Sequence, residues 1–129
     1  MKIERFITLP LVIFCVVAPI VAAIMYEKHR SGDYTAEIVA RAPERGNFSP
    51  QKLTVPVGEP VCLQIRNIDT VMHGFAIPDL GVDAGEIAAG YVVRVEFTPE
   101  KVGAYDYYCT VWCSEFHIQM RGILEVVAK

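Results

Sequence analysis

Residues 90–127 read GYVVRVEFTPEKVGAYDYYCTVWCSEFHIQMRGILEVV, and this stretch determines the fold class of the chain. It opens with a period-2 strand pattern, in which one face carries Tyr91, Val93, Val95 and Phe97 and the other carries Arg94, Glu96 and Thr98. Residues 99–103 predict a turn, and residues 104–109 and 122–127 predict two further strands. Three strands within this one stretch favour a β-rich domain.

The same alternation of apolar and polar residues continues toward the N-terminus, in short runs that Gly, Pro and Asn interrupt. These runs predict strands near residues 34–41, 53–57, 61–65 and 75–77. About seven strands in roughly 100 residues suffice for one sandwich core. We therefore expect an all-β sandwich or barrel, without an amphipathic helix in this part of the chain.

The first 30 residues have a different character. Phe6–Tyr26 is a run of 21 residues without a charge, and about 20 apolar residues are needed to cross a bilayer as a helix. We expect one N-terminal transmembrane helix, which Pro10 and Pro19 would bend. Residues 1–30 then form an anchor and link, with a polar link at Glu27–Asp33, and residues 31–129 form one extracytoplasmic domain.

A cleaved signal peptide is the alternative interpretation of this run. Lys2 and Arg5 precede it, and the small residues Val21, Ala22 and Ala23 offer a cleavage site. The run is longer than the usual apolar part of a signal peptide, about 7–15 residues, which favours the anchor. Flanking charges are nearly balanced on the two sides of the run, so they leave the orientation open.

The charge of the remaining chain restricts its partners. From Glu27 onward there are 10 Lys and Arg against 14 Asp and Glu, a net charge of −4. A chain with this balance and no basic stripe is not expected to bind nucleic acid.

Residues 109–120, between the last two predicted strands, form a C-x3-C-x3-H-x2-M run made of Cys109, Cys113, His117 and Met120. A further histidine, His73, lies upstream in Val-Met-His-Gly-Phe. Thiolate, thioether and imidazole together are the ligands that favour copper, whereas structural zinc sites use Cys and His without Met. A mononuclear blue-copper site needs one Cys, but two thiolates can bridge two copper ions.

A disulfide between Cys109 and Cys113 is the alternative for an extracytoplasmic domain. It would close a very small loop and would leave His117 and Met120 without a role. The combination of ligand types at close spacing therefore favours a metal.

Residues 48–127, with the Val-Met-His-Gly-Phe segment and the C-x3-C-x3-H-x2-M run, resemble the binuclear copper (CuA) domain of cytochrome c oxidase subunit II. Nitrous oxide reductase shares this family in part. The single apolar run is similar to the short, single-span second subunits of B-type haem-copper oxidases. The resemblance implies a cupredoxin-like Greek-key barrel.

The resemblance also implies a ligand set for two copper ions. Cys109 and Cys113 would be the bridging thiolates and His73 and His117 the terminal imidazoles, with Met120 and the backbone carbonyl of Val111 as weak axial ligands. Family members that bind magnesium or manganese at the interface with the catalytic subunit have glutamate in place of Val111, so that ion is not expected here. Ser114 replaces the glycine that usually follows the second cysteine.

The implied function is one-electron transfer in a respiratory chain. The chain would be the non-catalytic electron-entry subunit of a terminal oxidase in the plasma membrane, with its domain in the periplasm or outside the cell. It would accept electrons from a soluble c-type cytochrome or blue-copper protein and pass them to haem in subunit I. The alternatives are a CuA subunit of another haem-copper enzyme such as nitric oxide reductase, a copper-delivery or storage protein, and a disulfide-stapled assembly domain.

Several other residues near the cluster or elsewhere have ambiguous roles. Trp112 is a candidate for the electron-entry face, and packing in the core or at the rim is its alternative role. The remaining Cys, Met and His side chains are expected to be packed or solvated and not to bind metal, namely Cys15, Cys62, Met72 and His29.

Overall fold

The computed structural model describes the backbone of residues 2–31 and 33–129 and the side chains of residues 12–28 and 33–129. Within it the chain divides into two compact units, residues 1–33 and residues 34–129. The first contains one helix, and the second contains all of the strands.

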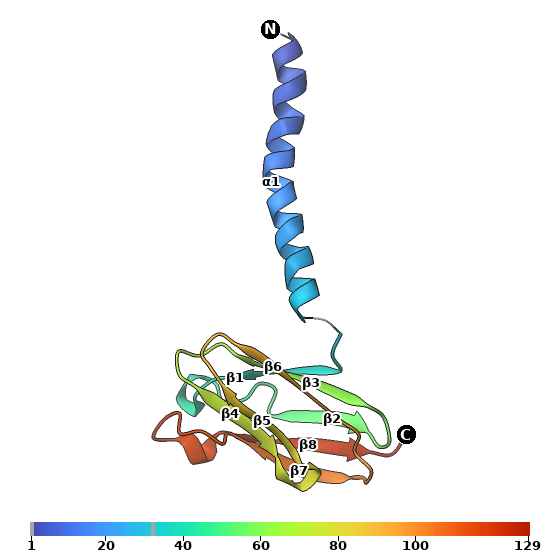
Figure 1. Cartoon of the computed structure of the whole chain (residues 1–129), viewed down its shortest axis with the longest axis vertical. Helices are drawn as coiled ribbons and strands as arrows, with labels where there is room; N and C mark the ends of the chain where they lie inside the picture. Colours follow the sequence, from blue (N-terminus) through green and yellow to red (C-terminus); the bar gives the residue numbers. More distant parts are fainter. Residues whose placement is uncertain (1, 32) are drawn as a thin grey trace. The chain divides into compact units, whose positions relative to one another are not determined.

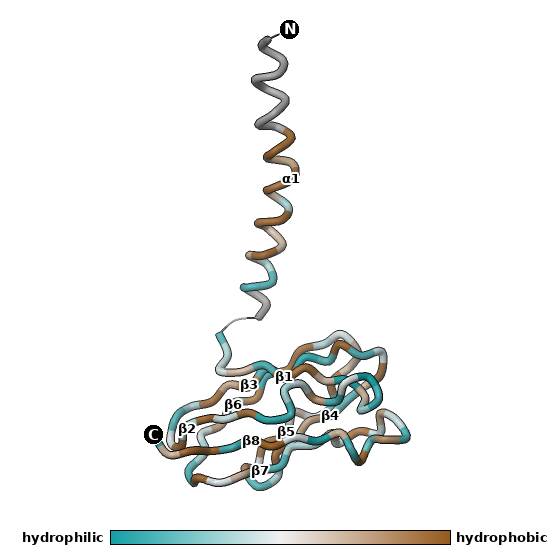
Figure 2. The backbone as a smooth tube through the Cα atoms, turned by 180° about the vertical axis from the view of Figure 1, so that it is seen from behind, coloured by the Kyte–Doolittle hydropathy of each residue, from teal (hydrophilic) through white to brown (hydrophobic). Residues whose placement is uncertain are grey.

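Helix α1, Lys2–Ser31, is continuous and includes Pro19. The first five residues of the predicted polar link, Glu27–Asp33, are therefore helical. Helix formation continues there because the sequence has no Gly or Pro between Pro19 and Gly32 and ends the run with good helix formers such as Glu27 and Lys28. Apolar residues dominate the described middle of α1, and polar ones follow near its C-terminal end (Figure 2).

Part of the predicted membrane span lies outside the described side chains, namely residues 6–11 with Pro10. Lys2, Arg5, His29 and Arg30 lie outside them as well. Among the residues that are described, no helix is long and apolar enough to span a membrane.

The second unit consists of eight strands and three single 3-10 turns (Figure 1). The strands are β1 Ala36–Ala40, β2 Lys52–Pro56, β3 Val61–Asn67, β4 His73–Ile77, β5 Val82–Ile87, β6 Val92–Phe97, β7 Gly103–Tyr108 and β8 Arg121–Val127. The turns are η1 Pro43–Arg45, η2 Pro78–Leu80 and η3 His117–Gln119. One sheet has the order β1-β3-β6 and the other the order β2-β8-β7-β4-β5.

Each sheet has one parallel pair, at the edge formed by β1 or β2. Strand β1 pairs in parallel with β3, and β2 pairs in parallel with β8, whereas the other neighbours are antiparallel. The observed unit is a mostly β, cupredoxin-like fold, as the sequence predicts.

The core lies between the inner faces of the two sheets. Ile38, Leu63 and Ile65 from the three-stranded sheet belong to one buried cluster with side chains of the five-stranded sheet. An aromatic group of Phe48, Phe75 and Tyr107 fills its centre, with ring centroids 5.3–5.7 Å apart. A domain of this size gains most of its stability from such apolar burial.

Seven predicted strands are confirmed, with ends shifted by at most two residues. Strand β5 is missed, because Val82–Ile87 contains a glycine and two acidic residues that interrupt the apolar alternation. Tyr91 is also misplaced: it precedes β6 and is 67% exposed, whereas Val93, Val95 and Phe97 pack partly against the core.

Candidate metal centre

The fold brings the two motif segments together at one end of the barrel. His73 is the first residue of β4, and Cys109 directly follows β7. These strands are antiparallel neighbours, with Ala76 opposite Tyr108, so the start of β4 lies beside the end of β7. Strand pairing thus places His73 next to Cys109, although they are 36 residues apart in sequence.

All six residues of the predicted site converge there. Cys109 Sγ lies 3.9 Å from His73 Nδ1, 4.0 Å from Cys113 Sγ and 3.2 Å from the carbonyl oxygen of Val111. Cys113 Sγ in turn lies 3.6 Å from His117 Nδ1 and 3.6 Å from Met120 Sδ. The two sulfurs therefore occupy the middle, and each adjoins a different imidazole.

The spacing of these donor atoms suits a soft metal ion. A metal bonded at about 2.0–2.3 Å to each of two donors holds the donors roughly 3.3–4 Å apart. The sulfur–sulfur, sulfur–nitrogen and thioether contacts of the cluster, 3.6–4.0 Å, fall in this range. The ligand atoms of His73, Cys109 and Cys113 also lie within 4.8 Å of one another. The chemistry and spacing of these side chains fit copper.

The loop that carries four of these side chains, Cys109–Met120, is closed by its own backbone. Cys109 N–H donates to the Met120 carbonyl at 3.0 Å, which joins the two ends of the loop. The η3 turn orders the far part, where His117 N–H donates to the Ser114 carbonyl and Met120 N–H to the His117 carbonyl. Met120 is fully buried, so its sulfur is held against Cys113.

The backbone of Gly74 approaches the buried thiol of Cys109 closely. Its N–H donates to Cys109 Sγ at 3.3 Å. A Cβ at this position would lie 2.0 Å from Thr110 Oγ1, so only glycine lets β4 come this near. Gly74 thus donates a hydrogen bond to the Cys109 sulfur, and its lack of a side chain lets β4 pack against Thr110.

The two thiols differ in acidity. Burial raises the pKa of Cys109, but hydrogen bonds from His73 and the Gly74 N–H outweigh it and bring that pKa below its ordinary value. Burial, and then the charge of Cys109, raise the pKa of Cys113 to about 12. The metal-free pair therefore retains a proton that binding through both thiolates would release.

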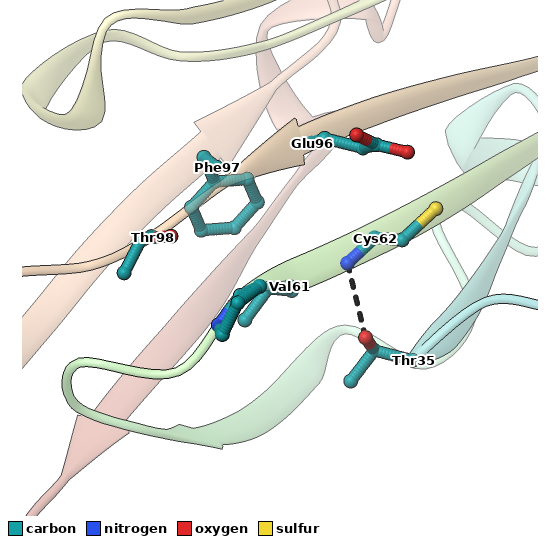
Figure 3. A pocket seen from close by; sticks show the side chains of 7 residues that line it. Thr35, Val61, Cys62, Glu96, Phe97 and Thr98 are labelled. Atoms are coloured by element: carbon teal, nitrogen blue, oxygen red, sulfur yellow. Dashed lines mark hydrogen bonds between the residues drawn. The ribbon is translucent and has the colours of Figure 1, made fainter.

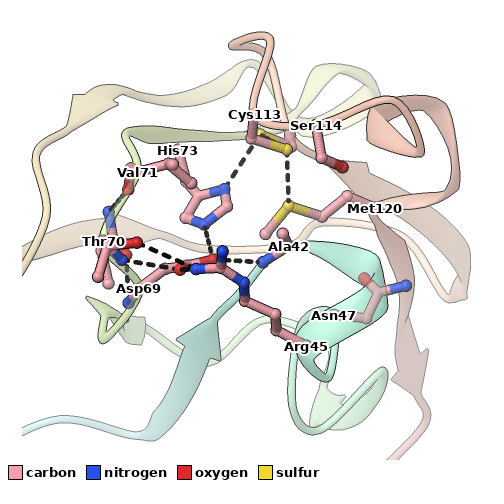
Figure 4. Close-up of polar contacts among 12 residues, drawn as sticks. Ala42, Arg45, Asn47, Asp69, Thr70, Val71, His73, Cys113, Ser114 and Met120 are labelled. Atoms are coloured by element: carbon pink, nitrogen blue, oxygen red, sulfur yellow. Dashed lines mark hydrogen bonds and ion pairs between the residues drawn. The ribbon is translucent and has the colours of Figure 1, made fainter.

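Asp69 is a functional residue that the sequence analysis did not identify. Its carboxylate Oδ2 lies 3.2 Å from His73 Nε2, on the ring edge opposite the sulfur (Figure 4). Burial opposes ionisation of Asp69, but hydrogen bonds from the Ala42 and Thr70 N–H groups, His73 and Arg45 lower its pKa below the ordinary value. Burial likewise opposes the charge on His73, and hydrogen bonds to Cys109 and Asp69 raise its pKa.

A carboxylate on the second nitrogen of a ligand histidine fixes the tautomer and the orientation of the ring. The signal for this role was present in the sequence, since Asp69 precedes His73 by four residues.

The other half of the cluster faces outward. His117 is partly exposed, and its ring centroid lies 5.8 Å from that of Trp112, which is 73% exposed. A surface hollow of about 440 Å³ beside them is lined by Tyr108, Cys109, Thr110, His117, Ile118 and Arg121. Packing in the core is thereby excluded for Trp112, which lies at the rim of the cluster.

The remaining sulfur residues lie outside this cluster. Cys62 lines a different hollow of about 420 Å³ between β3 and β6, where its N–H donates to Thr35 Oγ1 at 3.0 Å (Figure 3). Met72 is 41% exposed and Cys15 is exposed on α1. Among the described side chains all four cysteines are free thiols, and only His73, Cys109 and Cys113 form a group of three potential metal-binding side chains of the His, Cys and acidic types.

Comparison with known proteins agrees with the fold. The chain belongs to the cupredoxin-like domain family, whose model matches residues 12–126. It is 35% identical over 82 residues to the nitrous-oxide reductase of Stutzerimonas stutzeri, covering 61% of this chain and 13% of that enzyme. It is also 29% identical over 93 residues to cytochrome c oxidase subunit 2 of Thermus thermophilus, covering 72% of this chain and 65% of that subunit.

The structural comparison extends over the whole chain. A chain in the cryo-EM structure of a heme-copper terminal oxidase dimer superposes with a TM-score of 0.61 and 20% identity, covering 98% of this chain and 100% of that one. The resemblance to cytochrome c oxidase subunit II seen in the motifs is confirmed by these relatives. The chain spans about an eighth of the reductase and 65% of the oxidase subunit.

Proposed function

We propose that the chain is the electron-transfer subunit, subunit II, of a haem-copper terminal oxidase and that it holds a binuclear copper centre. One observation carries this proposal. Two free thiols lie 4.0 Å apart at the centre of the cluster, and each adjoins its own histidine. A mononuclear cupredoxin site needs only one thiolate, so the second cysteine and its histidine support a second copper ion.

The side chains of Cys109, Cys113, His73 and His117 would hold the two ions of the proposed centre. Met120 Sδ and the carbonyl oxygen of Val111 would be further, weaker donors. When bound, the copper pair would accept and release one electron at a time. The protein supplies the closed loop, the buried thioether and the Asp69 carboxylate that hold the donors in place before and after metal binding.

The outward half of the cluster suits electron entry. Trp112 is an exposed aromatic residue beside His117, with ring centroids 5.8 Å apart. A soluble c-type cytochrome or blue-copper donor that contacts this end would meet Trp112 beside the histidine. Rigid, exposed aromatic side chains often dominate such contacts.

The proposal also covers the partner and the location of the chain. Relatives named cytochrome c oxidase subunit 2 support pairing with a subunit I that carries haem. We propose that Phe6–Tyr26 anchors the chain in the plasma membrane by a single span and that the cupredoxin domain is extracytoplasmic. Mass spectrometry of the mature N-terminus tests the anchor, because a chain that starts near residue 24 would show cleavage instead.

Copper counting tests the centre itself. We expect the purified protein to bind two copper ions per chain by elemental analysis, and we expect Cys113→Ser to bind at most one. Lys52→Ala, on an exposed ion pair with Glu125, serves as the control and keeps two. A wild-type count of one, or a Cys113→Ser variant that still holds two, would contradict the proposed ligand set.

Relatives named nitrous-oxide reductase show that this kind of domain is not confined to oxidases. A second candidate is therefore a copper subunit of a haem-copper enzyme with another terminal acceptor, such as nitric oxide reductase. The ligand cluster alone serves either enzyme equally well. Co-purification of the native complex, followed by assays of oxygen and nitric oxide consumption, separates the two. Consumption of nitric oxide without oxygen uptake would favour the second candidate.

A further inference from the structure

Residues 42–47, between β1 and β2, touch both segments that carry the proposed copper ligands. On one side, Ala42 N–H donates to Asp69 Oδ2 at 2.7 Å, and Arg45 donates to Asp69 Oδ1 at 2.6 Å and to Thr70 Oγ1 at 3.0 Å. Asp69 is the residue that holds His73. These hydrogen bonds therefore fix Asp69 and Thr70, in the segment that leads into β4.

On the other side, the same residues reach the loop 109–120. The Asn47 amide donates to the Gln119 carbonyl at 2.9 Å, next to Met120. Ser114, which follows Cys113, donates its hydroxyl to Glu44 at 3.1 Å. These contacts join parts of the chain that are 70 or more residues apart. Figure 4 shows Arg45 and Asn47 extending from the same turn toward these two segments.

The backbone of this segment is held in an uncommon conformation. Asn47 has φ 62°, in the left-handed region that few residues other than glycine occupy. Its N–H donates to the Ala42 carbonyl, its side-chain oxygen accepts from Phe48 N–H at 2.7 Å, and Phe48 is fully buried in the aromatic core. Local strain that persists at a site indicates that the surrounding structure fixes it.

We propose that residues 42–47 act as a clamp that sets the position of the His73 segment relative to the loop 109–120, with Arg45 and Asn47 as positioning residues for the copper ligands. The proposal rests on the proposed copper centre and deepens it. Neither residue reaches a ligand atom. Arg45 acts through Asp69 on His73, and Asn47 acts through the Gln119 backbone on Met120.

If residues 42–47 act as this clamp, substitutions in it should weaken copper binding more than they lower the stability of the fold. Arg45→Gln leaves Asp69 with the partners Ala42, Thr70 and His73. Asn47→Gly keeps the left-handed backbone, and it removes both the amide donor to Gln119 and the acceptor of the Phe48 N–H. Loss of residues that orient ligands typically weakens metal binding by roughly 10–100-fold. Arg45→Lys keeps a cation within reach of Asp69 and should restore most of the affinity.

The experiment compares these variants with Lys52→Ala, which breaks an exposed ion pair on β2 away from the cluster. Copper affinity is measured by competition with a chelator, the copper hyperfine splitting by EPR, and the unfolding midpoint on metal-free protein. We expect a 10-fold or greater loss of affinity and altered splitting in Arg45→Gln and Asn47→Gly. Their midpoints should lie within about 5 °C of the control.

A copper-free measurement separates failure of the clamp from failure of the proposed centre. We measure amide hydrogen exchange at Cys109, whose N–H closes the loop, and at Met120, whose N–H donates to His117 in the η3 turn. Exchange at both should accelerate about 10-fold or more in the clamp variants relative to Lys52→Ala. If affinity, splitting and exchange all match the control, or if only the unfolding midpoint falls, the clamp is wrong. A wild-type protein that binds one copper or none contradicts the centre, and the exchange result still decides on the clamp.

Discussion

The inner and outer halves of the ligand cluster are built in different ways. In the inner half, His73 is fully buried between the Cys109 thiol and the Asp69 carboxylate, whose side chain is only 2% exposed. In the outer half, His117 is partly exposed and contacts Cys113 and the ring of the exposed Trp112. One histidine is thus fixed by a satisfied buried network, and the other lies where a partner protein can approach. Substitutions in the inner half should therefore lower the stability of the domain, and substitutions in the outer half should mainly affect electron entry.

The largest contrast is expected between His73→Ala and His117→Ala in the metal-free protein. Removal of His73 leaves a cavity and takes one partner from the buried Asp69, which should cost about 2–4 kcal/mol of unfolding free energy. Removal of His117 should cost less than about 1 kcal/mol, because its ring is near the surface. Thermal unfolding checks this, with midpoints that differ by roughly 10 °C or more. Equal midpoints would show that the inner half is no more tightly built than the outer.

Gly74→Ala should damage the inner half through a backbone contact. The added methyl group would lie 2.0 Å from Thr110 Oγ1 and would push the Gly74 N–H away from Cys109 Sγ. We expect a loss of about 1–3 kcal/mol in chemical denaturation. The double variant with Thr110→Ala should recover part of this loss, because the hydroxyl is the nearest atom. If the double variant is no more stable than Gly74→Ala, the loss does not come from the contact with Thr110.

Asp69 should make the metal-free domain sensitive to acid. Its pKa is lowered in the folded state, so its contribution to stability is present above the unfolded pKa of about 3.9 and is lost as the pH falls through the folded value. Asp69→Asn should remove this contribution at neutral pH and flatten the fall in stability below about pH 4. Urea titrations between about pH 2 and pH 7 test it. An unchanged slope in the variant would mean that other carboxylates carry the acid sensitivity.

The smallest effect on the fold is expected in the outer half, for Trp112→Leu. Because the side chain is 73% exposed, the unfolding free energy should change by less than about 0.5 kcal/mol. If Trp112 contacts the donor, its loss should weaken docking by ~1 kcal/mol or more, about fivefold, and slow transfer from the donor. Stopped-flow measurements with the donor provide the check. Unchanged transfer rates would remove Trp112 from the path of the electron.

The candidate ligands in the loop 109–120 could be recognised in the sequence because their spacing is local. Cys109, Cys113, His117 and Met120 lie within 12 residues, and unusual residue types at close spacing are conspicuous without a structure. Strands such as β6 were equally accessible, since Val93, Val95 and Phe97 alternate with charged residues. Strand β5 was not, because Gly85 and its acidic neighbours do not show an apolar alternation.

The clamp and the Asp69 network could not be predicted from the pattern of the chain. Arg45 and Asn47 lie in a short turn rich in polar residues, where such side chains are common for reasons unrelated to function. Their partners are 24 and 72 residues away, and only the folded sheet order brings them together. The extension of α1 beyond Tyr26 was missed for another reason, since charged residues were interpreted as a link although they are good helix formers.

The most direct test of the account is the EPR spectrum of the copper-loaded wild-type protein. An electron shared equally by two copper nuclei gives seven hyperfine lines, and this is the pattern that the paired thiols and their two histidines predict. A four-line spectrum would mean that one copper ion occupies the site alone and would contradict the binuclear centre. A sample that binds copper but gives no EPR signal under oxidising conditions would contradict it as well and would favour a carrier of Cu(I).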